Sequence, residues 1–158
     1  MTFQIRPTTD KDLQDIGNIA EKTGLFPREA LADMIAGYLR DAGPDIWLTA
    51  ERGGAAIGFC FCESERFTNG SWNLLAIGVL PELQKQGVGR RLLAHLESLL
   101  TKAGHRVLIV DTIGTSEFSR THAFYLATGF VSEARIRDFW DDGADKLTFW
   151  KHLRAATR

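Results

Sequence analysis

Apolar residues recur along this chain with two different periods, and each period predicts a different element. Alternating or continuous apolar positions are typical of strands, whereas apolar positions three and four apart are typical of one helix face. Strands are predicted at residues 3–6, 46–51, 55–64, 72–79, 106–111, 131–136 and 147–153. Helices are predicted between residues 9 and 24, between residues 27 and 43, and over residues 88–103 and 122–127. Gly24, Gly104 and Gly129 follow three of these helices, where a glycine readily ends a helix.

The elements come in the order β-α-α-β-β-β-α-β-α-β-β, which indicates one mixed α/β domain over residues 1–158. Gly53-Gly54 predicts a hairpin turn between the second and third strands, and a strand–helix–strand unit lies in the middle of the chain. No repeat, low-complexity tract or linker divides the sequence. A length of 158 residues, with 44% hydrophobic and 25% charged residues, suits one globular core.

Charge and cysteine content exclude several classes of function. The formal net charge of -1 lacks the basic excess that nucleic-acid binding requires. No apolar run approaches the ~18 residues that would predict a membrane-spanning helix, and the first residues do not resemble a signal peptide. Cys60 and Cys62 are too few for a four-ligand metal site and suit a reducing compartment. We therefore expect a cytoplasmic protein with no metal, no nucleic-acid partner and no membrane partner.

The most informative segment joins the strand at 72–79 to the helix at 88–103. It contains Gln84-x-x-Gly87-x-Gly89 together with Lys85 and Arg90. Amides at a helix start have no intrahelical partner, and the helix dipole adds positive charge, so this turn suits a pyrophosphate. The spacing fits neither a dinucleotide fingerprint nor a P-loop. The alternative interpretation is a tight turn whose glycines serve packing alone.

This segment and two others resemble the GNAT superfamily of N-acetyltransferases. The glycine turn matches the family signature (Arg/Gln)-x-x-Gly-x-(Gly/Ala), after a strand that ends Ile77-Gly-Val79-Leu-Pro. Residues 123–130, Ala-Phe-Tyr-Leu-Ala-Thr-Gly-Phe, resemble the family's late helix and the start of the strand after it. The opening Ile-Arg-Pro-Thr at 5–8, with Asp-Leu at 12–13, is similar to its first strand and helix. The matched pieces come in the family's order and span nearly the whole chain.

The resemblance implies a single-domain GNAT-like acyl-CoA N-acyltransferase fold, in which a splayed sheet holds acetyl-CoA between its fourth and fifth strands. The pyrophosphate would lie on backbone amides of the glycine turn, and the pantetheine arm would pair with the fourth strand. The residues implied in cofactor binding are Ile77, Gly78, Val79, Gln84, Lys85, Gln86, Gly87, Val88, Gly89, Arg90 and Ser119. Many relatives carry an asparagine where this chain has Phe118, and Ser119 or Thr121 would then supply a hydroxyl instead. Gly78 is consistent with a bulge or a close backbone approach.

The resemblance also implies how acetyl transfer to an amine would be catalysed. Tyr125 matches the family's general acid for the departing thiolate, and a buried core aromatic is the alternative. Asp111 matches an acidic position that serves as general base in some relatives; alternatively it caps the following turn. Glu117 and His122 are weaker base candidates, with His122 expected on the surface, and a water chain would also serve.

The acceptor side is less specific. Residues 138–145, Asp-Phe-Trp-Asp-Asp-Gly-Ala-Asp, combine aromatic and acidic side chains that suit a cationic amine, although Asp-Gly favours a plain hairpin turn. We expect transfer from acetyl-CoA to a primary amine on a small molecule or peptide, and a two-fold homodimer is compatible with a small enzyme. The alternatives are a non-catalytic acyl-CoA-binding module of the same fold and an unrelated nucleotide-binding domain.

Overall fold

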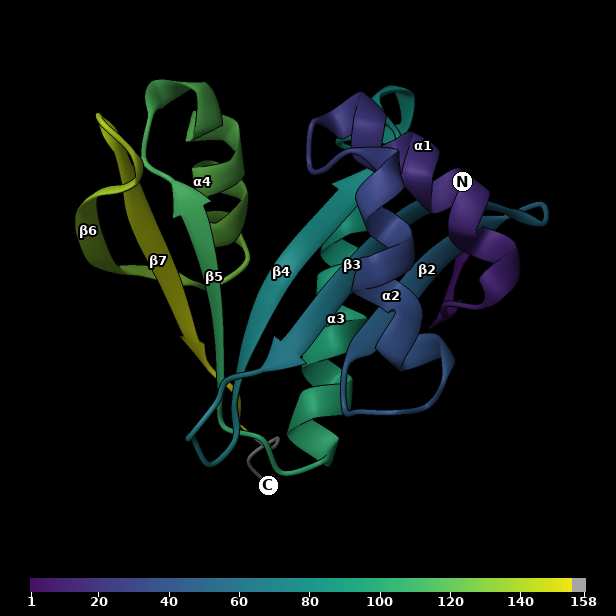
Figure 1. The fold of residues 1–158 in the computed structure, drawn as a ribbon, viewed down its shortest axis with the longest axis horizontal. Coiled ribbons are helices and arrows are strands. Elements are labelled where there is room, and N and C mark those ends of the chain that lie inside the picture. The colour runs from purple at the N-terminus through teal and green to yellow at the C-terminus, as the bar shows by residue number, and fades with distance from the viewer. Residues whose placement is uncertain (155–158) are drawn as a thin grey trace. The chain divides into compact units, whose positions relative to one another are not determined.

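The computed structural model describes residues 1–154, which form a seven-stranded mixed sheet and four α-helices. The elements are β1 (Gln4–Pro7), α1 (Leu13–Thr23), α2 (Leu31–Leu39), β2 (Ile46–Arg52), β3 (Ala55–Ser64), β4 (Ser71–Val79), α3 (Val88–Lys102), β5 (Val107–Ile113), α4 (Ser119–Ala127), β6 (Val131–Asp141) and β7 (Ala144–His152). This is the order predicted from the sequence (Figure 1).

The strands follow one another across the sheet in the order β1-β2-β3-β4-β5-β7-β6. The predicted hairpin of β2 and β3 is antiparallel, and β4 pairs with β5 in parallel, as the strand–helix–strand unit requires. The chain divides into two compact units. The first unit contains Met1–Ser64 and Leu75–Leu99, and the second contains Glu65–Leu74 and the chain from Leu100 on. The prediction of a single domain over 1–158 stays a prediction.

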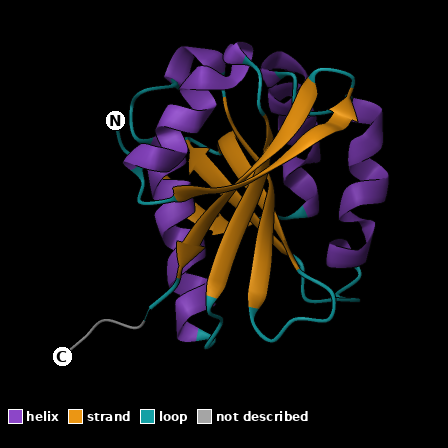
Figure 2. Cartoon of the chain, turned by 90° about the vertical axis from the view of Figure 1, so that its left-hand side faces the viewer, coloured by secondary structure: helices purple, strands orange, loops and turns teal. Residues whose placement is uncertain are grey.

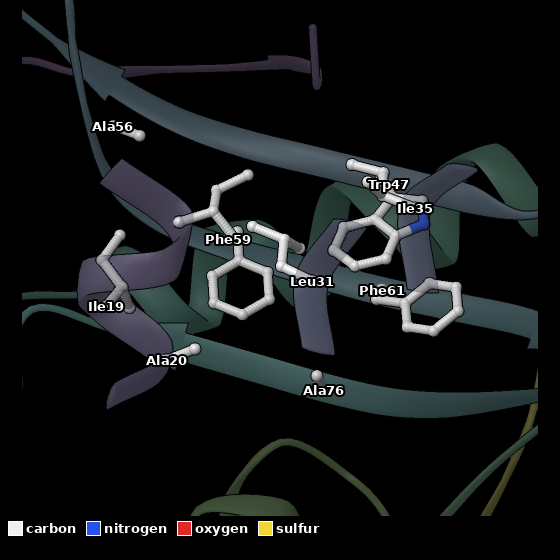
Figure 3. Close-up of a cluster of buried hydrophobic side chains, with 10 residues drawn as sticks. Ile19, Ala20, Leu31, Ile35, Trp47, Ala56, Phe59, Phe61 and Ala76 are labelled. Carbon is white, nitrogen blue, oxygen red and sulfur yellow. The ribbon is translucent and has the colours of Figure 1, made fainter. Parts of the chain in front are cut away.

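The core of the first unit lies between β2, β3 and the helices α1 and α2, which lie in front of these strands in Figure 1. Trp47 stacks on Phe61 with ring centroids 4.2 Å apart, and Phe59 lies beside them (Figure 3). The helices α1 and α2 contribute Ile19 and Leu31, among others, to this cluster. The sequence predicted both helices as amphipathic, each with one apolar face. A helix of this kind gains stability by burying its apolar face.

The opposite face of this sheet packs on α3. A Cβ at Gly58 on β3 would lie 3.2 Å from Val88 and 3.3 Å from Leu92, so β3 and α3 approach closely there. Cys60, on the same face as Gly58, is fully buried and unoxidised. Burial raises the pKa of the Cys60 thiol to about 12, which keeps the thiol protonated and unreactive.

A buried carboxylate ties β1 to the start of α1. Asp12 accepts hydrogen bonds from Arg6 Nη1 and Nη2, both at 2.8 Å, and from the Thr9 amide at 2.9 Å. Burial alone would raise the pKa of the Asp12 carboxyl, but these donors, with the hydroxyl of Thr49, outweigh burial and hold that pKa below its usual value. The contact therefore stabilises the fold at neutral pH.

In the second unit, β5, β7 and β6 form an antiparallel sheet that carries helix α4 on one face. Leu108, Val110, Leu147 and Phe149 are buried on that face. The hairpin β6–β7 is longer than predicted, because β6 runs to Asp141 rather than 136 and β7 starts at Ala144 rather than 147; Figure 2 colours the strands orange. Every residue of β6 is exposed, so this edge strand has no apolar alternation from which its end could be predicted.

Candidate functional site

The glycine turn lies in the first unit, between the end of β4 and the start of α3. A short 3-10 helix, Pro81–Leu83, follows β4, and the backbone is then left-handed at Lys85 (φ 63°) and Gly87 (φ 87°). A Cβ at Gly87 would meet no atom within 4 Å, so this position favours glycine for its backbone conformation and not for lack of space. The Gln84 side chain donates to the Val79 carbonyl at 3.1 Å, which ties the turn to the end of the strand.

The turn places backbone amides at the N-terminus of α3. The amide of Arg91 donates to the Gly87 carbonyl at 3.0 Å, which is the first bond of the helix. The amides of Val88, Gly89 and Arg90 precede that bond and have no intrahelical partner. Lys85 and Arg90 are exposed and add positive charge beside them. Amides without an intrahelical partner at a helix N-terminus, beside an exposed glycine, fit an anionic group such as a pyrophosphate.

Residues Leu75–Val79 form the edge strand of the first unit, next to β3. Ile77 is half-buried, and Gly78 and Val79 are buried. A Cβ at Gly78 would lie 2.8 Å from Leu25 and 3.2 Å from both Ile19 and Phe59. The glycine is therefore needed for close packing against α1 and the residues that follow it, a reason that the sequence did not show.

Asp111 lies within β5 in the second unit, and both of its carboxylate oxygens accept hydrogen bonds. Asn73 Nδ2 on β4 donates to Asp111 Oδ2 at 3.2 Å, and Thr148 Oγ1 on β7 donates to Asp111 Oδ1 at 2.6 Å. β5 continues to Ile113, so Asp111 does not close the strand, and the interpretation that it caps the following turn is wrong. A half-buried carboxylate held at both oxygens can accept a proton in a fixed orientation.

Asn73 is a site residue that the sequence interpretation missed. It pairs with Ile109 where β4 and β5 run in parallel, and its side chain lies between two acids. Besides Asp111, Asn73 Nδ2 donates to Glu65 Oε1 at 2.8 Å. Asn73 is 7% exposed, and its Oδ1 has no hydrogen-bond partner among residues 1–154. A polar residue in an otherwise apolar strand was the only available signal.

Tyr125 on α4 is 3% exposed and packs in the second unit against Phe130 and Phe149, with ring centroids 5.4 and 5.6 Å away. Phe149 and Thr148 are neighbours on β7, so their side chains point to opposite faces of the sheet. Since Tyr125 packs on Phe149 and Asp111 bonds to Thr148, the two predicted catalytic residues lie on opposite faces of β5–β7. The sheet itself therefore separates the two side chains.

The region around α4 differs in detail from the prediction. The helix begins at Ser119, which is exposed, directly after the half-buried Phe118. His122 was expected on the surface; instead it is half-buried, with Nε2 3.0 Å from the Ile113 carbonyl and its ring 5.6 Å from Phe149. Its contacts anchor α4 to the end of β5, while Glu117 is exposed on the preceding 3-10 helix.

Residues 138–145 form the tip of the β6–β7 hairpin, which supports the interpretation as a turn. Asp138 accepts from the Gly143 amide at 2.8 Å, and Asp145 accepts from the Asp138 amide at 3.0 Å. Lys146 Nζ lies 4.0 Å from the centre of the Phe139 ring. These carboxylates and this ring face thus have partners within the hairpin itself.

The predicted site residues fall into two groups. The first unit brings together Ile77 through Arg90, and the second unit contains Asp111, Ser119 and Tyr125. A shallow pocket of about 280 Å³ in the first unit, beside Asp15 and Lys22 of α1, contains none of them. Within residues 1–154, no group of three or more His, Cys, Asp or Glu side chains is arranged to hold a metal ion. None of the helices in that part of the chain has the length and apolar character needed to cross a membrane.

Solved structures show the same fold. A GNAT-family protein from Desulfovibrio desulfuricans, proposed to be an acetyltransferase, is 24% identical over 96% of this chain and 99% of that chain, with a TM-score of 0.90. The ribosomal-protein-S18-alanine N-acetyltransferase of Escherichia coli is 21% identical over 99% and 97% of the two chains, with a TM-score of 0.78. A protein from Salmonella typhimurium, proposed to be an acetyltransferase and solved with its cofactor acetyl-CoA, is 18% identical over 100% and 98%, with a TM-score of 0.77.

Sequence comparison gives the family directly. A search of the curated proteins finds no match. The family model for the acetyltransferase (GNAT) family matches residues 13–130, from the start of α1 to the end of the Tyr125 motif. That range is well over half of the chain and includes the glycine turn, Asn73 and Asp111. The chain belongs to the acetyltransferase (GNAT) family.

Proposed function

We propose that this protein is an N-acetyltransferase that transfers an acetyl group from acetyl-CoA to a primary amine by direct attack. The observation that carries the proposal is the exposed turn at the start of α3 in a member of this family. Its left-handed residues Lys85 and Gly87 leave the amides of Val88, Gly89 and Arg90 free of intrahelical bonds.

Each part of the chain then has a defined task. The amides of residues 85–90 bind the pyrophosphate of acetyl-CoA, and the edge of β4 at Ile77–Val79 pairs with the pantetheine arm. Gln84 holds the turn to the strand through its bond to Val79, and Ser119 offers a hydroxyl at the start of α4. Acetyl-CoA supplies the acetyl thioester.

The nitrogen must lose two protons, one before and one after it attacks the acyl carbon, and the departing sulfur must gain one. Asp111 takes a proton from the acceptor's ammonium group, which frees the nitrogen lone pair to form the new N–C bond. A backbone amide of Ile77–Val79 polarises the acyl carbonyl while the C–S bond breaks. Tyr125 gives its hydroxyl proton to the departing sulfur, and the nitrogen's second proton returns the phenolate to its neutral form. The two hydrogen bonds that fix the Asp111 carboxylate support its role as the proton acceptor.

A thiol-release screen tests the proposal. Purified protein is incubated with acetyl-CoA and an amine panel that contains an amino acid, a polyamine, an aminoglycoside and a peptide with N-terminal alanine. The peptide is included because the Escherichia coli structural neighbour is a ribosomal-protein-S18-alanine N-acetyltransferase. Release of coenzyme A with one class of amine, and acetylated product by mass spectrometry, are expected.

Two variants test the roles of the side chains. Tyr125→Phe and Asp111→Asn should each lower kcat by about 10²-fold, the lower end of the range for general acid–base catalysis. Full activity of Tyr125→Phe at every pH would show that the acid role is wrong. Saturable acetyl-CoA binding without thiol release over the whole panel would instead favour the non-catalytic acyl-CoA-binding module.

A further inference from the structure

One amide group in the second unit holds two carboxylates. Asn73 Nδ2 donates to Glu65 Oε1 at 2.8 Å and to Asp111 Oδ2 at 3.2 Å. An amide nitrogen carries two hydrogens, so each acid receives one, and the two carboxylates are near neighbours. Glu65 comes from the segment before β4 and Asp111 from the middle of β5, so neither chain proximity nor strand pairing alone brings them together.

Two like charges held side by side repel each other, and a cation between or beside them relieves that repulsion. Asn73 cannot neutralise the pair, because an amide is uncharged; it can only fix where the oxygens point. Glu65 and Asp111 are half-buried rather than buried, so neither residue is fully closed off from solvent. An ammonium ion, with positive charge and three N–H donors, matches that arrangement.

We propose that Asn73 is a positioning residue that holds Glu65 and Asp111 side by side so that this face of the sheet receives the acceptor amine as an ammonium ion. Asp111 then takes the proton, and Glu65 provides the second negative charge that selects for a cationic acceptor. The inference rests on the proposed function, because it concerns the acceptor side of the same reaction.

On this face of the second unit, β7 carries two charged or titratable side chains, Lys146 and, farther along, His152 opposite Val107. Thr148 on β7 donates to the second oxygen of Asp111 at 2.6 Å. Lys146, two residues before Thr148 on β7 and on the same face, is the nearest cation among the paired residues. It lies opposite Ile113, and its Nζ lies over the Phe139 ring. On β6, the residues opposite Thr148 and Lys146 are the uncharged Ala134 and Ile136.

Three substitutions separate the charge of Glu65 from the hydrogen bonds to Asp111. Glu65→Gln keeps an oxygen that accepts from Asn73 and removes only the charge. In Asn73→Leu, the new side chain has a similar volume and removes the donor to both carboxylates. The substitution breaks no hydrogen bond to Asn73 Oδ1, because that atom has no partner among the described residues. Thr148→Val has a similar shape and removes the donor to the other oxygen of Asp111.

The proposal expects shifts of opposite sign in the acid limb of the pH profile of kcat/KM, measured with the amine selected by the thiol-release screen. Without its negative neighbour, Asp111 stays ionised to lower pH, so Glu65→Gln should move the acid limb down by about half a pH unit to one unit. When a hydrogen-bond donor to Asp111 is removed, the ionised form of that carboxylate is less favoured. Asn73→Leu and Thr148→Val should therefore each move the acid limb up by about one pH unit. Glu65→Gln should also raise KM for the amine about five- to tenfold, with KM for acetyl-CoA unchanged.

Controls keep the test independent of stability and of the reaction itself. Glu133→Gln removes the same charge from an exposed position on β6 and should leave the profile unchanged. Carboxyl resonances of ¹³C-labelled protein, with that of Asp111 assigned through Asp111→Asn, should show the same opposite movements without acetyl-CoA. If Asn73→Leu does not fold, Thr148→Val carries the same expectation.

The outcomes distinguish the two proposals. If Asp111→Asn is inactive but the acid limb stays fixed in Glu65→Gln and Thr148→Val, or moves in the same direction in both, the inference about Asn73 and Glu65 is overturned and the transferase proposal stands. If Asp111→Asn keeps wild-type activity, the base assigned in the proposed function is wrong and the inference falls with it.

Discussion

The glycines at the two ends of α3 allow the anion-binding turn to be tested separately from stability. Gly87 precedes the helix with φ 87°, and Gly104 follows it with φ 84°. A Cβ at either position would meet no atom within 4 Å. Replacement by alanine therefore creates no clash at either site and adds only the free energy of a left-handed alanine, about 1 kcal/mol.

The two variants should lose the same stability but differ in binding. For a chain of this length, about 1 kcal/mol lowers Tm by about 2–4 °C, and we expect this for both Gly87→Ala and Gly104→Ala. In Gly87→Ala the turn keeps its left-handed conformation, and the added methyl group lies where the pyrophosphate must approach the amides. The affinity should then fall by about 5- to 30-fold, equivalent to about 1–2 kcal/mol, whereas Gly104→Ala should keep the wild-type affinity.

Isothermal titration calorimetry with acetyl-CoA measures the affinity, and thermal melting without ligand measures the stability. Unchanged affinity in Gly87→Ala, despite the expected loss of Tm, would refute the role given to the turn. An equal loss of affinity in both variants would show that acetyl-CoA binding responds to strain anywhere along α3.

Three further predictions concern packing, pH and thiol chemistry. Gly78→Ala should lower the free energy of unfolding by about 1–3 kcal/mol because its Cβ overlaps neighbours, whereas Gly37→Ala, in open space within α2, should raise it by about 0.5–1 kcal/mol; urea unfolding measures both. Arg6→Met should lower it by about 2–3 kcal/mol at pH 7, because Asp12 keeps its charge and loses its partner. Folding lowers the pKa of the Asp12 carboxyl, so its contribution to stability is present above the usual pKa of ~3.9 and is lost as pH falls through the folded value. The free energies of unfolding of wild type and Arg6→Met should therefore converge in acid. A constant difference between them from pH 7 to pH 3 would contradict this. The buried thiol of Cys60 should not react with a disulfide reagent at pH 8 until the chain is unfolded, and rapid reaction of the native protein would contradict its burial.

The order of elements could be predicted because each buried face leaves a period in the sequence. Ile16 and Ala20 in α1, and Leu31 and Ile35 in α2, recur at helical spacing since each helix buries one stripe. The end of β6 could not be predicted, because an exposed edge strand places no residue in the core and is defined only by its pairing with β7. The start of α4 was misplaced for a related reason: Ser119 is exposed and adds nothing to an apolar stripe.

The residues of the candidate site also divide into those that a local pattern predicts and those that it does not. The glycine turn was found because its chemistry depends on consecutive residues, whose backbone conformations can be inferred locally. The role of Asn73 depends on the parallel register that places it opposite Ile109, and the sequence does not encode that register in any local pattern. His122 was misjudged because its partner, the Ile113 carbonyl, lies at the end of β5, a different element from α4. Contacts between distant segments require the fold, whereas turns and helix starts do not.

The central claim is that the amides of Lys85 through Arg90 bind the pyrophosphate of acetyl-CoA, and backbone-resolved NMR tests it most directly. In ¹H–¹⁵N spectra of the uniformly labelled protein, titration with acetyl-CoA should move the amide resonances of residues 85–90 the most among those in the first unit. The same amides should respond to inorganic pyrophosphate, with lower affinity. Saturable binding of acetyl-CoA that leaves the resonances of residues 85–90 in place would contradict the account.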